Sequence, residues 1–395
     1  MNHGIFVRLK NIVAGLGFDG TELTILFMGD KFDLTENAIH TNQESLRKFF
    51  NSPLLKIKYC KTKPRDNNRA NKFGAVFSAI FDISKTEEFF TEMDTASVEQ
   101  LSQELQDGYD VLFVHRLASF VPVMKYKIPI KSPILFDLDD IEYLAYFRAL
   151  AQPPFWGSKF LKYFHLPSIA WATFRALKMS SRSFVCSELD VRKLRSHMNI
   201  NTAYSLPNSI EKPLSTPHSS CGKTFLFVGT FDYPPNVNAV EFFLNCIWPR
   251  IKKAVPNAQF FCAGVNPENI RHYYQSIDGV SFLGYVDALD DLYANSKIVV
   301  CPVLSGGGTR VKIIEAAAFG KPVVSTNAGA EGLDFTDQVE IFIAKDSDAF
   351  ARYCIQLLHS DDMCSKVGTA AKKKYNLLYT KDAFIQNLSA HLHSV

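Results

Sequence analysis

The sequence lacks long apolar runs, a strong excess of charge and internal repeats. No apolar run approaches the roughly 18 residues of a membrane-spanning helix. Polar residues and glycines break up residues 5–16, and no small-residue cleavage pattern follows, so the N-terminus is not expected to be a signal peptide. A net charge of +3 over 395 residues argues against a protein that binds nucleic acid over its whole surface. We expect a cytoplasmic protein that touches a membrane only from its surface, if at all.

Paired cysteines are also absent. The eight cysteines form no CxxC motif, and several lie inside apolar runs such as Phe261-Cys262-Ala263 and Val299-Val300-Cys301. This pattern predicts buried, reduced thiols rather than disulfides or a zinc site.

What is present is a pattern of two α/β domains. The chain is too long for one ordinary domain, and from residue 221 onward short apolar segments alternate with helical ones, which predicts a parallel sheet covered on both faces. There we expect strands at 225–229, 259–264, 280–283, 298–302 and 322–326, and helices at 236–255, 267–276, 287–295, 310–319, 347–359, 361–375 and 381–393. In the first half we expect strands at 23–28, 111–114, 134–136 and 184–186 and a helix at 187–198.

The turn Leu206-Pro207-Asn208-Ser209 is the expected linker. The predicted division is residues 1–206 for the acceptor-side domain and 207–376 for a nucleotide-sugar-binding domain. Residues 377–395 would form a C-terminal helix that packs back on the first domain.

The richest segment runs from Ser305 to Thr326. It begins with Gly306-Gly307-Gly308-Thr309, and glycines let the backbone approach a ligand closely and offer N–H groups to an anion at a helix start. Arg310 and Lys312 add positive charge to the first helical turn, where the helix dipole disfavours cations, so an anionic ligand is indicated. Glu315, further along the helix, is placed to accept hydrogen bonds from a ribose. A purely structural tight turn is the alternative reading, and the combination favours a phosphate-and-ribose site.

This segment resembles the donor-site signature of family 4 GT-B glycosyltransferases, the retaining enzymes that use UDP- or GDP-sugars. Further matches, in the family's order and spacing, are Phe227-Val228-Gly229 with Pro235-Asn236, Phe282-Leu283-Gly284-Tyr285-Val286, and Thr326 with Ala330-Glu331-Gly332-Leu333. Together they cover about residues 184 to 390. The resemblance implies an α/β fold of two Rossmann-like domains that face each other across a cleft.

The resemblance also implies roles for residues. Gly229 and Thr230 would line the diphosphate, together with the glycine loop 306–309. Arg310 and Lys312 would face the phosphates, Glu315 would hold the ribose, and Tyr285-Val286 would lie against the base. The family's usual motif has two glutamates separated by seven intervening residues, and the position of the first, which reaches the sugar, is Gly307 here; some exopolysaccharide-type members resemble this glycine-rich version.

The first half of the chain matches less of the family pattern. Residues 4–16 resemble the helix after the family's first glycine loop, which would leave the first strand and most of that loop missing. Either the start was misassigned, or the chain is complete and its acceptor side is degenerate. His115 falls where a family histidine often faces the sugar, although a lone histidine at a strand end is commonly structural.

A D-x-D motif, Asp137-Leu138-Asp139-Asp140, follows a predicted strand. In another glycosyltransferase fold such a motif binds a divalent metal, whereas the resemblance here implies an enzyme without metal or other cofactor. We therefore expect Asp137, Asp139 and Asp140 to line the acceptor side of the cleft or to cap the next helix.

Residues 143–187 contain no acidic side chain and interleave basic with aromatic residues. Basic, aromatic-rich amphipathic segments can lie on anionic membranes, so a peripheral membrane contact through 155–182 is one interpretation. The other is a buried helix with a solvated basic edge.

The sequence as a whole predicts a hexosyltransferase of polysaccharide biosynthesis. It would move a sugar from a nucleoside diphosphate sugar to a glycan or lipid-linked acceptor, with retention and without nucleic acid as a partner. A sugar-nucleotide epimerase of the same fold is an alternative, and it would need a carboxylate pair for which Asp137, Asp139 and Asp140 are the candidates. A non-catalytic nucleotide-binding protein is the other.

Overall fold

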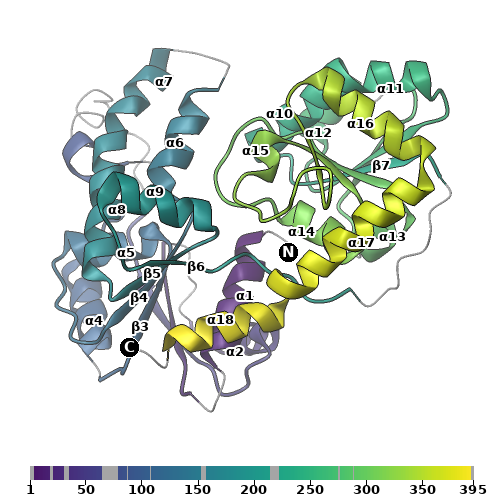
Figure 1. The fold of residues 1–395 in the computed structure, drawn as a ribbon. Helices are drawn as coiled ribbons and strands as arrows, with labels where there is room; N and C mark the ends of the chain where they lie inside the picture. The colour runs from purple at the N-terminus through teal and green to yellow at the C-terminus, as the bar shows by residue number, and fades with distance from the viewer. Residues whose placement is uncertain are drawn as a thin grey trace. The chain divides into compact units, whose positions relative to one another are not determined.

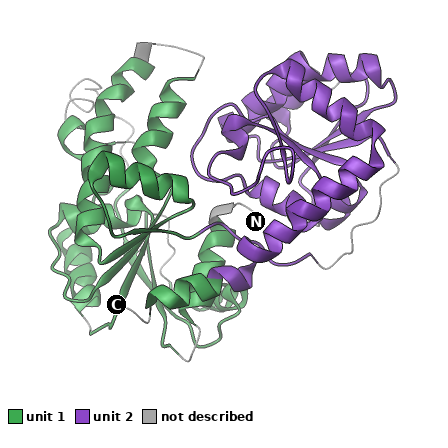
Figure 2. Ribbon diagram, viewed as in Figure 1, with its two compact units in different colours: residues 1–206, 385–395 green, residues 207–384 purple. Residues whose placement is uncertain are grey.

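A computed structural model describes residues 4–17, 21–30, 35–64, 79–86, 88–106, 108–152, 157–213, 222–274, 276–287 and 289–392. The chain divides into two compact units (Figure 2). Unit 1 comprises Met1–Leu206 and Ile385–Val395, and unit 2 comprises Pro207–Phe384. Each unit has a parallel sheet and a hydrophobic core of its own.

Unit 2 is built on a six-stranded parallel sheet with the order β12-β11-β10-β7-β8-β9. The strands are β7 (Thr224–Val228), β8 (Gln259–Ala263), β9 (Val280–Gly284), β10 (Ile298–Cys301), β11 (Val323–Thr326) and β12 (Phe342–Ala344). Every residue of β10 is buried, as expected for a central strand covered on both faces.

The helices of unit 2 follow the strands in alternation. They are α10 (Pro234–Phe242), α11 (Trp248–Ala254), α12 (Glu268–Tyr274), α13 (Leu289–Asn295), α14 (Val311–Ala318), α15 (Asn327–Ala330), α16 (Ser347–His359) and α17 (Asp361–Leu378). Figure 1 shows α10, α11 and α16 on one face of the sheet and α14 and α17 on the other.

The single helix expected over 236–255 is interrupted. A π-helical turn, Phe243–Ile247, separates α10 from α11. Pro249 lies at the start of α11, where it has no N–H for the carbonyl of Asn245 and its ring crowds that carbonyl. The helix widens there, so the prediction of one regular helix was wrong in this respect.

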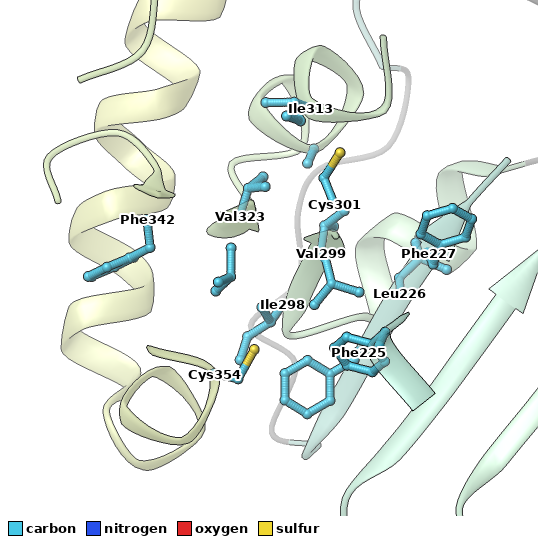
Figure 3. Close-up of a cluster of buried hydrophobic side chains, with 14 of the residues drawn as sticks. Phe225, Leu226, Phe227, Ile298, Val299, Cys301, Ile313, Val323, Phe342 and Cys354 are labelled. Carbon is cyan, nitrogen blue, oxygen red and sulfur yellow. The ribbon is translucent and has the colours of Figure 1, made fainter. Parts of the chain in front are cut away.

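The core of unit 2 lies between the sheet and its helices. Figure 3 shows side chains from four strands meeting in one cluster with Ile313 of α14 and Cys354 of α16. Phe225 and Phe227 of β7 are fully buried in it. Their contribution is large because aromatic side chains remove much apolar area from water.

Unit 1 contains two parallel sheets among the residues that the structure describes. One is four-stranded with the order β3-β4-β5-β6, and the other pairs β1 with β2. The strands are β1 (Thr24–Gly29), β2 (Lys56–Lys61), β3 (Leu112–His115), β4 (Ile134–Asp139), β5 (Arg182–Val185) and β6 (Ala203–Ser205).

The helices of unit 1 are mostly short. They are α1 (Gly4–Leu16), α2 (Glu36–Phe50), α4 (Thr95–Gln106), α5 (Leu117–Lys125), α6 (Glu142–Leu150), α7 (Gly157–Lys162), α8 (Leu166–Met179) and α9 (Glu188–Met198). The last helix, α18 (Lys381–Leu392), starts in unit 2 and ends in unit 1, where Leu388 packs against Gly15 of α1.

The seven cysteines in the described ranges are all free, and six of them are buried; Cys221 lies outside those ranges. Burial raises the pKa of the Cys60 and Cys364 thiols to about 11. Across the described residues, no helix combines the length and apolarity that crossing a membrane requires.

Candidate functional site

The order of the strands in unit 2 locates the place where a ligand fits. β7 and β10 are neighbours, and the chain continues from β7 outward to β8 on one side and from β10 outward to β11 on the other. The loops that leave the carboxyl ends of β7 and β10 therefore diverge, and a switch point of this kind is where open α/β sheets generally bind ligands. The loop after β7 starts at Gly229, and the loop after β10 contains the three glycines. Both predicted donor-binding loops thus lie at the same switch point.

Glycines follow or end three adjacent strands at this edge of the sheet. Gly229 donates its N–H to the carbonyl of Ala263, and Gly264 donates to Gly284, with distances of 2.9 Å and 2.8 Å. A Cβ on Gly264, whose φ is +152°, would lie 1.9 Å from the carbonyl oxygen of Gly229, so no larger residue fits there. A Cβ on Gly229 would lie 2.8 Å from the Asn236 amide. These strand ends can approach one another, and a ligand, only as bare backbone.

The predicted base-binding residues follow the third of these glycines. Gly284 has a φ of +73°, and a Cβ there would meet open space. Tyr285 comes next and is 54% exposed, while Val286 is partly buried. An exposed aromatic ring at the carboxyl end of β9 is available for stacking on a flat ring system. Thr230, the other predicted neighbour of the diphosphate, follows Gly229 and accepts a hydrogen bond at its carbonyl from Asn236, at 2.9 Å.

The glycine loop after β10 is held from two sides. Gly306 has a φ of +122°, and a Cβ there would lie 3.0 Å from the Tyr233 hydroxyl and 3.1 Å from Arg310. Thr309 is buried, and its Oγ1 accepts a hydrogen bond of 3.0 Å from the side chain of Asn208. The segment expected to be a linker therefore fixes one end of the loop.

Arg310 and Lys312 stand at the start of α14, and no acidic side chain of the described residues pairs with either. Arg310 Nη1 donates to the carbonyls of Gly307 and Gly308, the latter at 2.8 Å. Lys312 Nζ donates to Asn236 Oδ1 at 2.9 Å and lies 3.8 Å from the ring centroid of Phe227. Among the described residues, neither cation has a carboxylate within ion-pairing distance. Burial, reinforced by the nearby charge of Arg310, lowers the pKa of Lys312 to about 8. Two cations held without a counter-charge form a site for a multiply charged anion.

Glu315 lies one turn further along α14. Its Oε2 accepts a hydrogen bond of 2.6 Å from the Tyr293 hydroxyl of α13. In the described part of the chain its second oxygen accepts no hydrogen bond, which leaves an acceptor for a ligand hydroxyl. Burial raises the pKa of Glu315 above its ordinary value, and the bond from Tyr293 and the charge of Lys312 act against that shift.

The loop after β10 and helix α14 together present, in chain order, the backbone N–H groups of the glycines, two cations and one carboxylate. The arrangement matches a diphosphate with a ribose attached. The structure brings together the predicted residues Gly229, Thr230 and Lys312 through Asn236, which touches or approaches all three.

In unit 1 the predicted acceptor-side residues gather at the carboxyl ends of β3 and β4. Asp137 is fully buried; Arg8 Nε donates to its Oδ2 at 2.9 Å, and His115 Nδ1 lies 2.8 Å from the same oxygen. Arg8 Nη1 also donates to the carbonyl of Leu206 at 2.9 Å. Burial alone would raise the pKa of Asp137, but the charge of Arg8 and the bonds from His115 and Arg8 hold it well below its usual range. Asp137 therefore ties α1 to β4, and in the structure it does not line an open surface.

His115 shows one open hydrogen-bonding position. Its Nδ1 faces Asp137, while its Nε2 is buried and has no hydrogen-bond partner among the residues that the structure describes. The carboxylate orients the ring and leaves Nε2 for a ligand group.

The other two aspartates do not cap the following helix. The N-cap of α6 is Ile141, and no side chain makes a capping hydrogen bond there. Asp139 has a φ of +64° and accepts a hydrogen bond of 2.9 Å from the Cys186 thiol, while Asp140 starts the turn into α6. The capping interpretation was therefore wrong, because Asp139 is turned toward β5 at an irregularity in the β4–β5 pairing. No group of three or more His, Cys, Asp or Glu in the described ranges is arranged to hold a metal ion.

Two further residues at this edge were not predicted. Glu142 accepts a hydrogen bond from the backbone N–H of Leu117, and burial raises its pKa to about 7 despite the nearby Arg116. Arg116 has a φ of +67°, and its Nε is buried with no hydrogen-bond partner in the described part of the chain. A non-glycine residue with a left-handed backbone directly after a strand is a signal that the sequence alone does not display.

Comparison with known proteins bears on this geometry. Residues 222–360 match the family model described as glycosyl transferases group 1. The fold matches solved glycosyltransferase structures over nearly the whole chain. The chain has the GT-B fold. The resemblance inferred from the donor-site motif and the expected pair of Rossmann-like domains are thereby confirmed.

Several solved GT-B structures are similar at low sequence identity. Sucrose-phosphate synthase from Thermosynechococcus elongatus has a TM-score of 0.65 at 15% identity, covering 94% of this chain and 99% of that one. Anabaena Alr3699/HepE, in complex with UDP and glucose, has a TM-score of 0.64 at 14% identity, covering 100% and 97%. TarM from S. aureus, in complex with Fondaparinux, alpha-GlcNAc-glycerol and UDP, has a TM-score of 0.59 at 13% identity, covering 74% and 58%. Identities this low establish the GT-B fold and leave the substrates to be argued from the site.

One curated relative is similar in sequence. It is described as an uncharacterized 44.6 kDa protein in the cps region of Klebsiella pneumoniae and is 28% identical over 139 residues, which is 33% of this chain. The match spans 36% of the length of that relative.

Proposed function

We propose that the protein transfers a sugar from a nucleoside diphosphate sugar to a glycan or lipid-linked acceptor. The observation that carries the proposal is the pair Arg310 and Lys312, two cations that no carboxylate of the described ranges pairs with, at the switch point of a Rossmann-like sheet. A diphosphate supplies the missing counter-charge, and Glu315 offers an acceptor to the ribose. The group 1 family match over 222–360 supports this donor class, as does the UDP in the described complexes of HepE and TarM.

The chemistry follows from where charge develops. Breaking the bond between sugar and diphosphate leaves negative charge on the departing phosphate, and the loop N–H groups, Arg310 and Lys312 stabilise that charge without a metal. We propose retention, in which the departing phosphate oxygen takes the proton of the acceptor hydroxyl and no enzyme nucleophile is required. His115 Nε2, buried and without a partner, is proposed to bind a sugar hydroxyl.

The finer assignment is a hexosyl transfer in polysaccharide biosynthesis. It draws on the relative named from a cps region and on the sugars in the described HepE and TarM complexes. Buried free thiols fit a reducing compartment, so we place the reaction in the cytoplasm, without nucleic acid as a partner.

The test is a binding screen followed by product analysis. Calorimetry and thermal shift would be measured with UDP, GDP, ADP, CMP and their sugar conjugates, with and without magnesium, on the wild type and on Arg310→Ala/Lys312→Ala. Selective, magnesium-independent binding of one diphosphate by the wild type, weakened in the variant, is expected. A changed sugar nucleotide formed from donor alone would identify an epimerase. Binding of no nucleotide would overturn the proposal.

A further inference from the structure

Helices α6 to α8 of unit 1 carry a concentration of exposed aromatic side chains. The exposed large apolar residues in this run are Phe147, Phe160, Phe164, Trp171 and Met179, and both Phe160 and Trp171 are more than 60% exposed. Figure 1 shows α6 and α7 extending beyond the four-stranded sheet of unit 1. Phe155 and Trp156, which belong to the same stretch of sequence, lie outside the described residues.

α8 has two distinct faces. Its inner face consists of aliphatic residues and of two residues whose hydroxyls donate to backbone carbonyls: Ser168, Ile169, Ala172, Thr173, Ala176 and Leu177 are buried. Its outer face begins in the preceding 3₁₀ turn, Tyr163–His165, and continues at helical spacing with the exposed residues Phe164, Pro167, Trp171, Arg175 and Lys178. The inner face already packs on the core of unit 1, so the outer aromatics are not needed for folding. The interpretation of this segment as a buried helix with a solvated basic edge agrees with the buried inner face and with the exposed Arg175 and Lys178, but it did not include the exposed aromatic residues Phe164 and Trp171.

The outer aromatic side chains are held by one another. Trp171 stacks on Phe174 with ring centroids 5.6 Å apart, and Lys178 Nζ lies 5.7 Å from the Phe174 centroid. At the other end of the run, the rings of Phe147 and Phe160 both pack on Tyr163, with centroids 6.2 Å and 6.5 Å from the Tyr163 centroid. Mutual packing limits the rotamers of these side chains, so less entropy is lost when a partner covers them.

The charge of this face has one sign. No acidic residue occurs from 143 to 187, and Arg175 and Lys178 are exposed beside the aromatics. Exposed faces of soluble proteins ordinarily mix both signs. A face that combines aromatic rings with basic ends and offers no carboxylate complements a surface that is apolar below and anionic above.

We propose that the outer face of Phe164–Met179 docks on an anionic lipid bilayer, with Phe164 and Trp171 inserted at the level of the headgroups and Arg175 and Lys178 contacting lipid phosphates. This docking goes beyond sugar transfer and does not depend on it. A bilayer is favoured over a protein partner because the face is a single helical stripe with no acceptor side chains of opposite charge, whereas protein interfaces carry many directed hydrogen bonds.

The test is co-sedimentation of the full chain with vesicles, without nucleotide. Vesicles of phosphatidylcholine alone would be compared with vesicles that also contain phosphatidylglycerol, at low and high salt. We expect binding to the anionic vesicles, weakened by salt. Phe164→Ser/Trp171→Ser and Arg175→Glu/Lys178→Glu should each lower the partition coefficient at least ~10-fold.

The controls make the same changes at exposed positions elsewhere. Phe81→Ser/Leu377→Ser matches the apolar variant, and Lys61→Glu/Lys253→Glu matches the change of charge. Both controls should bind like the wild type, and circular dichroism should show all variants folded, since every changed side chain is exposed. Equal binding of the face variants and the controls would overturn the proposal, as would equal binding to neutral vesicles. A dimer in light scattering that Phe164→Ser/Trp171→Ser abolishes, without vesicle binding, would assign the face to a second copy instead.

Discussion

The hydroxyl of Tyr293 donates a hydrogen bond of 2.6 Å to Glu315 Oε2. Tyr293 belongs to α13, which precedes β10, and Glu315 belongs to α14, which follows it. Tyr293 is itself fixed by stacking on Phe319, with centroids 5.1 Å apart and nearly parallel planes. One oxygen of the carboxylate is thus occupied by a rigid partner, and the other has a defined direction for a ribose hydroxyl.

Removing that partner should weaken nucleotide binding. Tyr293→Phe keeps the ring and loses one hydrogen bond worth about 1 kcal/mol, so we expect roughly fivefold weaker binding of the preferred nucleoside diphosphate. Glu315→Ala should cost at least as much, and calorimetry measures both. Tyr353→Phe removes a hydroxyl from α16, where the ring packs on Phe342 of the edge strand β12, and serves as the control. Unchanged affinity in Glu315→Ala would contradict the ribose assignment.

The two cations of α14 should distinguish phosphates from nucleosides. Arg310→Ala/Lys312→Ala removes the positive charge that faces the proposed diphosphate, so affinity for a nucleoside diphosphate should fall by tenfold or more while affinity for the nucleoside changes little. Lys345→Ala/Arg352→Ala deletes the same charge from exposed positions of unit 2 and should have no such effect. Titration calorimetry with the nucleoside and with the nucleoside diphosphate measures both affinities. Equal losses for nucleoside and diphosphate would argue against phosphate contacts.

The buried ammonium of Lys312 predicts an unusual dependence of stability on pH. Its pKa is lowered from 10.5 to about 8, first by burial, so between these values the unfolded chain holds a proton that the folded chain has released. The contribution of this group to the free energy of unfolding therefore rises with pH across that window. Below pH 8 the charged side chain costs at most about 3 kcal/mol.

Lys312→Met should reveal this contribution in urea unfolding without ligand. The variant should be more stable than the wild type below pH 8, and the difference should shrink toward pH 10.5. Lys345→Met, at an exposed position, is the control. A difference in the free energy of unfolding that stays constant from pH 7 to pH 10.5 would show that burial does not destabilise the charged ammonium.

Much of unit 2 was predictable because its strands are buried on both faces. A strand such as Ile298–Cys301 is a continuous apolar run, and the turn that follows is marked by glycines. β2 was missed because half of Lys56–Lys61 is lysine and its two buried residues, Ile57 and Cys60, are three positions apart, which is not the period-two spacing of a strand. β6 and β12 have three residues each, which is too short for a periodic signal.

The candidate site also has a part that the sequence predicts and a part that it does not. Glycines and cations that lie close together in the chain, such as Gly306 and Arg310, predict an anion site from local sequence. Their partners are remote: Tyr293 reaches Glu315 across 22 residues, and Asn208 reaches Thr309 across 101. No local pattern specifies such pairs, because they are set by the order of strands in the sheet. Arg8 lies in a helix that also contains Lys10 and Asn11, so the local sequence does not single it out, and its partner Asp137 is 129 residues away.

Glu142 should titrate near neutral pH. Burial raises its pKa from 4.5 to about 7, so between these values the folded chain keeps a proton that the unfolded chain releases. Its contribution to stability is present at low pH and is lost as the pH rises from 4.5 to 7. Glu142→Gln cannot ionise, so its stability relative to the wild type should increase over this range. Urea unfolding of both proteins measures the difference, with Glu99→Gln, at an exposed position of α4, as the control. A difference independent of pH would place the ionisation of Glu142 outside this window.

The ion pair between Arg8 and Asp137 should be among the most sensitive points of unit 1. Arg8 is 1% exposed and Asp137 is fully buried, so Arg8→Met leaves a carboxylate without its main counter-charge and should cost about 3–5 kcal/mol. Arg8→Met/Asp137→Asn removes both charges and should recover part of that loss. The destabilisation of the double variant should therefore be smaller than the sum of those of Arg8→Met and Asp137→Asn. Lys10→Met, on the same helix, is the control and should cost far less. Urea unfolding followed by circular dichroism gives all four values. An Arg8→Met variant within about 1 kcal/mol of the wild type would show that His115 alone can hold Asp137 and that α1 is joined to β4 by packing rather than by charge.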